Sequence, residues 1–224
     1  MIQKSRPSGP RTAFTLIELM VVITIIAILM ALLIPATIIA KGQARRTEAA
    51  HDDAAIVNAV KAYFTEYGKY PDAFPAASVQ GASSDTAVGD PEAGMANANS
   101  FLFNILRSLN AAPNLGFVQN PRQTVYFDTR LVQNPAAPKA GFMDNPGVNQ
   151  AVRGCLFDPW GKQYNVVMDT NFDNMINLDA YYTDFATPNS PNLSVGAFSM
   201  GADNKLGTGG NKVYQKSDDI VSWQ

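Results

Sequence analysis

The chain opens with an apolar run that is continuous rather than periodic. The residues from Leu19 to Ala40 carry no charge, and only Thr24, Pro35 and Thr37 dilute the hydrophobic side chains. A helix of about 20 such residues spans the hydrocarbon core of a bilayer, whereas a secretory signal peptide holds only about 7–15 apolar residues. The pattern therefore predicts a membrane-spanning helix.

Basic residues flank this run on both sides. Three precede it, at Lys4, Arg6 and Arg11. Lys and Arg favour the cytoplasmic side of a membrane, so these three predict a single-pass protein whose C-terminal part lies outside the cytoplasm. Three more follow the run and weaken that bias: Lys41, Arg45 and Arg46.

Glu18 stands at the head of the apolar run and is the first acidic residue of the chain. A carboxylate inside a bilayer costs about 2–3 kcal/mol on insertion scales, and less near the interface. Two interpretations remain open. Glu18 caps the first turn of the helix at the level of the lipid headgroups, or it serves a purpose beyond membrane anchoring.

The pattern becomes periodic beyond the span. Apolar residues recur at helical i, i+3, i+4 spacing, and Gly68 and Pro71 end the pattern; the stripe comprises Ile56, Val57, Val60, Tyr63, Phe64 and Tyr67. We therefore expect an amphipathic continuation over residues 41–70. Together with the span it makes one helix of roughly 50 residues, with Pro35 and Gly42 as places where a helix bends.

Three polar residues on this helix, His51, Asp52 and Asp53, invite two interpretations. They could form a metal cluster, or they could be a solvated helix face. The solvated face is the interpretation we favour, because a run of charges on a surface helix is usually exposed.

The remaining residues, 71–224, are rich in Gly, Pro, Asn and Asp and predict a globular domain with long loops. A long loop is expected from Asp72 to Ser100, a short helix from Phe101 to Asn110, and a turn at "DPWG" from Asp158 to Gly161. The segments "TVYFD", "QYNVVMD", "MINLDAYY" and "VGAFSMGAD" read as strands, the second and third as a hairpin. The predicted fold class is α+β: a long N-terminal hydrophobic helix packed on a small antiparallel sheet.

Composition excludes several classes of function. A net charge of −2 with no basic stripe argues against nucleic acid as a partner. Cys155 is the only cysteine, so there is no intrachain disulfide, and His51 is the only histidine. No paired acid and base, nucleophile motif or phosphate-binding loop emerges, so we expect no enzyme and no organic cofactor.

The stretch "AFTLIELMVVITIIAIL" closely resembles the N-terminal processing motif of type IV pilins and type II secretion pseudopilins. The resemblance implies that prepilin peptidase removes a leader, residues 1–13, by cutting between Ala13 and Phe14. Phe14 then becomes the N-methylated first residue, and residues 14–40 form the transmembrane and polymerisation helix. The family usually has Gly before the cut, where this chain has Ala13.

The resemblance also gives Glu18 a physical role in assembly. Cleavage would create an amine at Phe14, about 6 Å along the helix axis from Glu18. When subunits pack side by side, the amine of one meets Glu18 of its neighbour. At 4 Å and an effective dielectric constant of about 20, such a pair gains on the order of 4 kcal/mol, which offsets its burial. Glu18 would thereby set the register between subunits.

The globular region resembles the major pseudopilin of type II secretion more than a typical pilin. The matching segments are "YGKYP", "DPWGKQY", "SMGAD" and "DDIVSW". That likeness implies a structural subunit of a periplasmic fibre, anchored in the bacterial inner membrane. Its partners would be further copies of the chain, minor pseudopilins and the inner-membrane platform of the secretion system. The loops between Asp72 and Arg153 are longer than the family pattern.

Two acidic loops are candidates for calcium, which takes six to eight oxygen ligands. In the major pseudopilins a C-terminal loop holds calcium, and the resemblance carries that role to Asp203, Asp218 and Asp219; a merely polar tail is the alternative. The other loop, "DTNFDNMIN", spaces its acids as in an EF-hand. Because Ala180 stands where the bidentate acid belongs, a tight turn is favoured there.

Two rivals remain. One is a type IV pilin or minor pilin for adhesion, motility or DNA uptake. The other is a membrane-tethered extracytoplasmic binding domain that uses its long loops for recognition and forms no polymer.

Overall fold

The computed structural model describes residues 15–71, 85–144 and 152–223. The chain divides into two compact units, Met1–Ala44 and Arg45–Gln224. The predicted leader, residues 1–13, lies outside the described residues.

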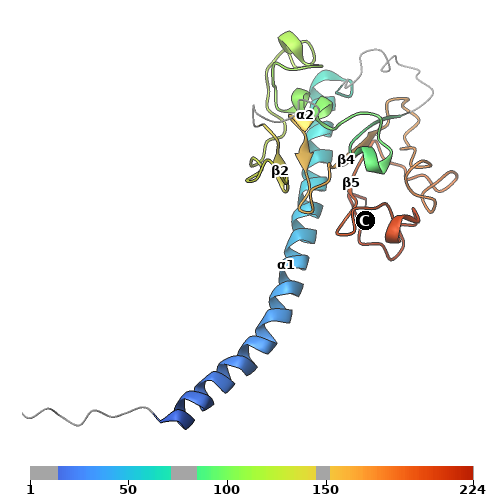
Figure 1. Cartoon of the computed structure of the whole chain (residues 1–224). Helices are drawn as coiled ribbons and strands as arrows, with labels where there is room; N and C mark the ends of the chain where they lie inside the picture. The colour runs from blue at the N-terminus through green and yellow to red at the C-terminus, as the bar shows by residue number, and fades with distance from the viewer. Residues whose placement is uncertain (1–14, 72–84, 145–151, 224) are drawn as a thin grey trace, which may run out of the picture. The chain divides into compact units, whose positions relative to one another are not determined.

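Helix α1, Leu16–Tyr67, passes through Pro35 without interruption (Figure 1). It ends at Gly68, which takes the left-handed conformation (φ +65°) and donates its N–H to the Phe64 carbonyl at 2.8 Å. Glycine adopts this conformation without steric cost and commonly ends helices. The predicted long helix and its end are thus confirmed.

In the first unit the apolar side chains of α1 have no protein around them. The large hydrophobic side chains from Leu16 to Ile39 are 46–76% exposed. The most apolar part of the helix has a mean hydropathy of 3.0, and the helix is long enough to cross a membrane. An exposed helix that is apolar on all sides calls for a lipid or protein environment.

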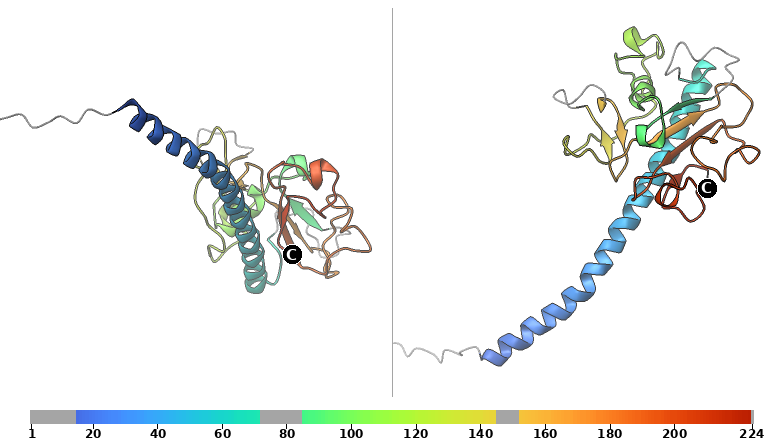
Figure 2. Two further views of the ribbon diagram at one scale, coloured as in Figure 1. Left: turned by 90° about the horizontal axis from the view of Figure 1, so that it is seen from below. Right: turned by 45° about the vertical axis from the view of Figure 1, so that its right-hand side comes forward.

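The second unit contains a four-stranded antiparallel sheet and a two-stranded one (Figure 2). The larger sheet has the order β1-β4-β5-β6, with the strands Thr86–Val88, Asn165–Met168, Val195–Ser199 and Ile220–Val221. The smaller sheet pairs β2, Gly141–Phe142, with β3, Leu156–Phe157. The α+β class is confirmed.

Both faces of the larger sheet are covered. Val166 and Met168 of β4 belong to the same core cluster as Ile56 and Val60 of α1. Val167, which points to the other face, packs in a second cluster with residues of the segment 176–182. Successive strand residues point to opposite faces, so a strand covered on both sides is apolar throughout. This is why β4 and β5 show no alternation of polar and apolar residues.

Gly196 of β5 allows the covering segments to approach closely. A Cβ atom built there would lie 2.5 Å from Ile176 Cδ1 and 2.9 Å from a ring carbon of Trp223. A larger residue would push these side chains away from the sheet.

Asn99, directly before α2 (Ser100–Leu106), links the two sheets. Its amide nitrogen donates to the carbonyls of Leu156, at 2.9 Å, and Tyr164, at 3.0 Å, and its oxygen accepts the Leu156 N–H at 3.0 Å. One buried amide therefore satisfies backbone groups of β3 and of the residue that precedes β4.

Several sequence-based assignments of short elements were wrong. The segment expected as a loop from Asp72 to Ser100 contains β1, and the helix expected to end at Asn110 ends at Leu106. "TVYFD" and "MINLDAYY" form no strand; β4 pairs with β1 and β5 instead. The described residues include the short 3-10 turns η1 (Pro91–Ala93), η2 (Leu115–Phe117) and η4 (Thr208–Gly210).

The expected solvated face at residues 51–53 was wrong for one residue. His51 is exposed and Asp52 is half-buried, but Asp53 is completely buried. Asp53 follows Ala49 by four residues and precedes Ile56 by three, so helical geometry places it on the face that meets the sheet.

Candidate functional site

The first described turn of α1 is closed by Thr15 and Glu18. Glu18 Oε2 accepts the Thr15 backbone N–H at 2.8 Å and its hydroxyl at 2.7 Å, while the Glu18 N–H donates to Thr15 Oγ1 at 3.3 Å. This reciprocal arrangement is a capping box, which satisfies backbone donors that have no partner within the helix. Glu18 therefore caps the helix, as one of its two interpretations required.

Capping uses only one oxygen of the Glu18 carboxylate and leaves the other available for a further contact. Both contacts from Thr15 go to Oε2, and Oε1 accepts no hydrogen bond from any described residue. The side chain is exposed at the surface of the single subunit. Ala13 and Phe14, the predicted cleavage residues, lie outside the described residues. Because capping uses only Oε2, it is compatible with the predicted pairing of Glu18 with an amine.

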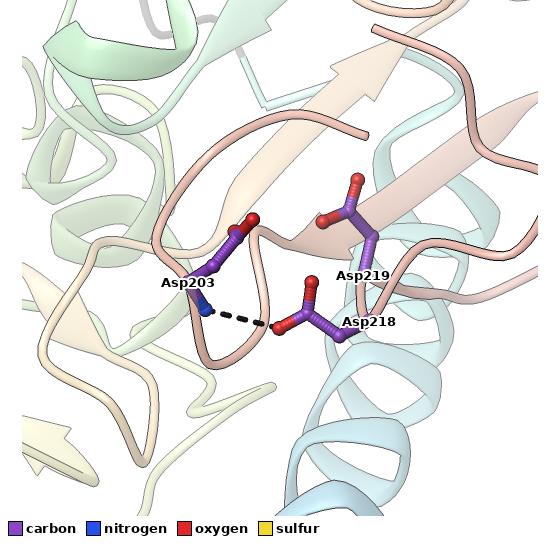
Figure 3. A group of neighbouring side chains, drawn as sticks. All are labelled: Asp203, Asp218 and Asp219. Atoms are coloured by element: carbon purple, nitrogen blue, oxygen red, sulfur yellow. Dashed lines mark hydrogen bonds between the residues drawn. The ribbon is translucent and has the colours of Figure 1, made fainter. Parts of the chain in front are cut away.

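A second candidate site lies in the loop between β5 and β6, where three carboxylates meet (Figure 3). Asp203, Asp218 and Asp219 each offer an oxygen, and these oxygens lie within 4.8 Å of one another. The sequence separates the first of these residues widely from the other two. The loop brings them together because β5 and β6 are antiparallel neighbours.

Backbone N–H groups hold two of these carboxylates in place. Asp218 Oδ2 accepts from Asp203 N at 3.0 Å, the bond drawn in Figure 3, and from Ala202 N at 2.5 Å. Asp203 in turn accepts the N–H groups of Lys205 and Gly209.

Asp219 is the buried member of the group. Its Oδ2 accepts the Tyr182 hydroxyl at 2.8 Å and the Gly207 N–H at 2.7 Å. Its Oδ1 is buried and has no hydrogen-bond partner among the described residues. Burial raises the pKa of Asp219 from 3.8 to about 6, and the charges of Asp218 and Asp203 act in the same direction.

These residues fit a calcium ion chemically. Three carboxylates provide hard oxygen ligands, which calcium prefers. A cation would also compensate for mutual repulsion among the acids and would give the unpartnered Asp219 oxygen a partner.

The loop also contacts the long helix within the same unit. The Arg46 guanidinium donates to the Asp218 carbonyl at 3.5 Å, a long hydrogen bond. Sequence patterns gave no sign of this contact, or of the Tyr182 hydroxyl as a partner of Asp219, because both depend on how the loops return to the core.

The loop that resembles an EF-hand is arranged as a turn. Both Asp169 oxygens accept backbone N–H groups, those of Asp173 and Asn174, and Asp173 Oδ1 accepts the Met175 N–H. Ile176 is buried at its end. The acids in this loop serve to close the turn, in agreement with the interpretation favoured from the sequence.

The prokaryotic N-terminal methylation motif matches residues 10–34 of the chain. The N-terminal segment carries a prepilin motif. The match includes Phe14 and Glu18 and indicates a type IV pilin-like prepilin, which implies processing by prepilin peptidase and pilin-like assembly. Together with the exposed apolar helix, it indicates membrane anchoring. No curated protein and no solved structure matches the chain.

Proposed function

We propose that this chain is a structural, non-enzymatic subunit of a pilin-like fibre, the pseudopilus of a type II protein secretion system. It would be made as a precursor, cut before Phe14, methylated there and polymerised through its N-terminal helix. The observation that carries this proposal is the methylation motif on a helix whose apolar surface is exposed from Leu16 to Ile39.

The choice of a secretion pseudopilus over a type IV pilus rests on the globular domain. The "DPWG" turn forms as predicted, since the Gly161 N–H donates to the Asp158 carbonyl at 3.2 Å. The acidic loop between β5 and β6 offers three carboxylates at the place where the pseudopilin resemblance puts calcium. The single cysteine, Cys155, is buried and leaves no disulfide to close a pilin-type C-terminal region.

Calcium bound by Asp203, Asp218 and Asp219 belongs to the same proposal. The ion would fix the loop between the last two strands and would perform no chemistry. Backbone carbonyls and water would complete its coordination shell.

Processing is tested by the intact mass and the N-terminal sequence of the chain recovered from membranes, with and without the host's prepilin peptidase. We expect a chain that begins at Phe14 and carries one added methyl group, only when the peptidase is present. A chain that keeps residues 1–13 would overturn the proposal and would favour a membrane-tethered binding domain.

A deletion strain then separates the two kinds of fibre. A secretion pseudopilus predicts that exported proteins accumulate in the periplasm while surface pili persist. Loss of surface pili with normal secretion would instead assign the chain to a type IV pilus.

A further inference from the structure

Asp53 interrupts the apolar stripe by which α1 packs on the sheet. The helix residues before and after it on this face, Ala49, Ile56 and Val60, are fully buried. Asp53 is equally buried, with no exposed surface. A position that geometry reserves for a hydrophobic side chain therefore holds a carboxyl group.

This carboxyl group lacks the contacts that a buried charge requires. Neither Oδ1 nor Oδ2 has a hydrogen-bond partner among the described residues. No described Lys, Arg or His forms an ion pair with Asp53. An ionised carboxylate in such surroundings is strongly unfavourable, and the group keeps its proton instead.

Asp158 is a second buried acid whose charge acts on Asp53, and hydrogen-bond donors surround it. Its Oδ1 accepts the N–H groups of Trp160, Gly161 and Lys162 at 2.7–2.9 Å, and its Oδ2 accepts the Ser199 hydroxyl at 2.6 Å. Four donors favour a charge on Asp158 over a charge on Asp53. Of these two buried acids, the one without hydrogen-bond donors is the one that holds a proton.

The other titratable groups near Asp53 also oppose its ionisation. Asp52, its neighbour on the helix, accepts the Tyr164 hydroxyl at 2.9 Å. Burial raises the pKa of Asp53 well above 3.8, and the charges of Asp158 and Asp52 add to this effect. Burial raises the pKa values of Tyr164 and Tyr182, so neither tyrosine brings a charge near Asp53.

We propose that Asp53 is a proton-operated latch between α1 and the sheet. As a neutral carboxylic acid it lets the two pack together, and loss of its proton weakens that packing. The proposal goes beyond fibre formation, because it makes the stability of the subunit itself depend on the proton concentration around it.

The direction of the pH dependence follows from the raised pKa. Below pH 3.8 Asp53 is protonated in both the folded and the unfolded chain, and α1 packs on the sheet. Between that pH and the higher pKa of the folded state, only the folded chain holds it. The ratio of folded to unfolded chain then falls about tenfold for each pH unit, and the fall stops once the folded chain also releases the proton.

The test is urea unfolding of the full chain in detergent micelles over a range of pH, followed by tryptophan fluorescence. Trp160 and Trp223 are the two tryptophans of the chain, and both lie in the second unit. Asp53→Asn imitates the neutral acid. We expect this variant to lose the tenfold dependence per pH unit that Asp53 contributes, and to be more stable than the wild type at the upper end of the range.

The control is Asp52→Asn, which changes the neighbouring acid. It should keep the contribution of Asp53 to the pH dependence of stability. Parallel pH profiles for the wild type and Asp53→Asn would overturn the proposal. Asp53→Ala, which also removes the proton site, replaces Asp53→Asn should the latter fail to fold.

Infrared spectroscopy provides a readout that loss of packing alone would not change. A protonated carboxylic acid has a C=O stretch distinct from that of a carboxylate. We expect this band to be stronger at pH 5 in the wild type and in Asp52→Asn than in Asp53→Asn. A wild-type band at pH 5 no stronger than that of Asp53→Asn would show that Asp53 is ionised and would overturn the latch.

Discussion

At the scale of single residues, the Glu18 carboxylate caps α1 and is proposed to pair with a neighbouring subunit. One oxygen takes both contacts from Thr15 and caps α1, while the other accepts nothing from the described chain. Capping alone accounts for a glutamate near a membrane surface. The proposed role in assembly requires its negative charge in addition, since only a charge would offset a buried amine of a neighbouring subunit.

A pair of substitutions separates these purposes. Glu18→Gln keeps a residue suited to the capping box but removes the charge, whereas Thr15→Ala weakens the cap and keeps the charge. If the charge sets the register between subunits, Glu18→Gln should be inserted and cleaved normally while its fibre yield falls about tenfold or more, because a stranded buried charge costs several kcal/mol. The yield is measured by sedimentation of sheared fibres.

Thr15→Ala should cost only about 0.5–2 kcal/mol of local helix stability and should leave assembly intact. The reverse result, with fibres from Glu18→Gln and none from Thr15→Ala, would reduce Glu18 to a cap.

At the scale of elements, the sequence predicted an element well only where several sequence features indicated it together. Helix α1 has a continuous apolar run, a periodic stripe and a glycine stop, and its C-terminal end was predicted to within three residues. Strands β2, β3 and β6 contain two residues each, too few for any periodicity. The segment "TVYFD" is apolar and extended, yet the N–H groups of Tyr126 and Phe127 donate to the Leu106 carbonyl rather than to a neighbouring strand.

The candidate sites show the same limit. Glu18 stood out because a charge beside a long apolar run is costly. The acids of the β5–β6 loop were grouped by family resemblance, since nothing in their spacing brings Asp203 near Asp218 before the strands pair. Asp53 was misjudged because its charge outweighed its position, although helical spacing from Ala49 and Ile56 already placed it in the core.

The contact that ties the end of α2 to the smaller sheet depends on one arginine. Arg107 is nearly buried, donates to both oxygens of Asp144 at 3.1 and 2.6 Å, and lies 3.9 Å above the Phe142 ring. Lysine has neither the planar fork nor the stacking surface. We expect Arg107→Lys to lower the free energy of unfolding by about 1–3 kcal/mol, measured by urea denaturation.

Arg122 offers a matched control, since it forms an ion pair with Glu66 on the surface and is 69% exposed. Exposed pairs contribute about 0–1 kcal/mol, so Arg122→Lys should change stability little. Equal effects of the two substitutions would mean that the burial of Arg107 adds nothing to the free energy of unfolding.

At the scale of the molecule, the two units suit different surroundings. The first exposes an apolar helix, whereas the second buries hydrophobic clusters against both faces of the larger sheet. Within the second unit the strands of the larger sheet are short, and β6 has only two residues. Loop contacts must therefore contribute much of the stability of the second unit.

The contribution of loop contacts to stability can be measured at the β5–β6 loop. It joins the last strand to the sheet, and its Asp218 carbonyl accepts a hydrogen bond from Arg46 of α1. Calcium held by its three carboxylates would stabilise only the folded state, by about 2.7 kcal/mol at a hundredfold excess over the dissociation constant. For a domain of this size we expect a chelator to lower Tm by roughly 5–10 °C in calorimetry of the full chain in detergent.

Asp218→Asn should abolish the response to chelator, because it removes one of the converging charges. Glu92→Gln, on an exposed residue paired with Lys162, should respond as the wild type does. A wild-type Tm that ignores both calcium and chelator would make the loop a polar turn closed by its own backbone N–H groups. Without a metal ion, Asp219 would take up a proton as the pH falls below about 6.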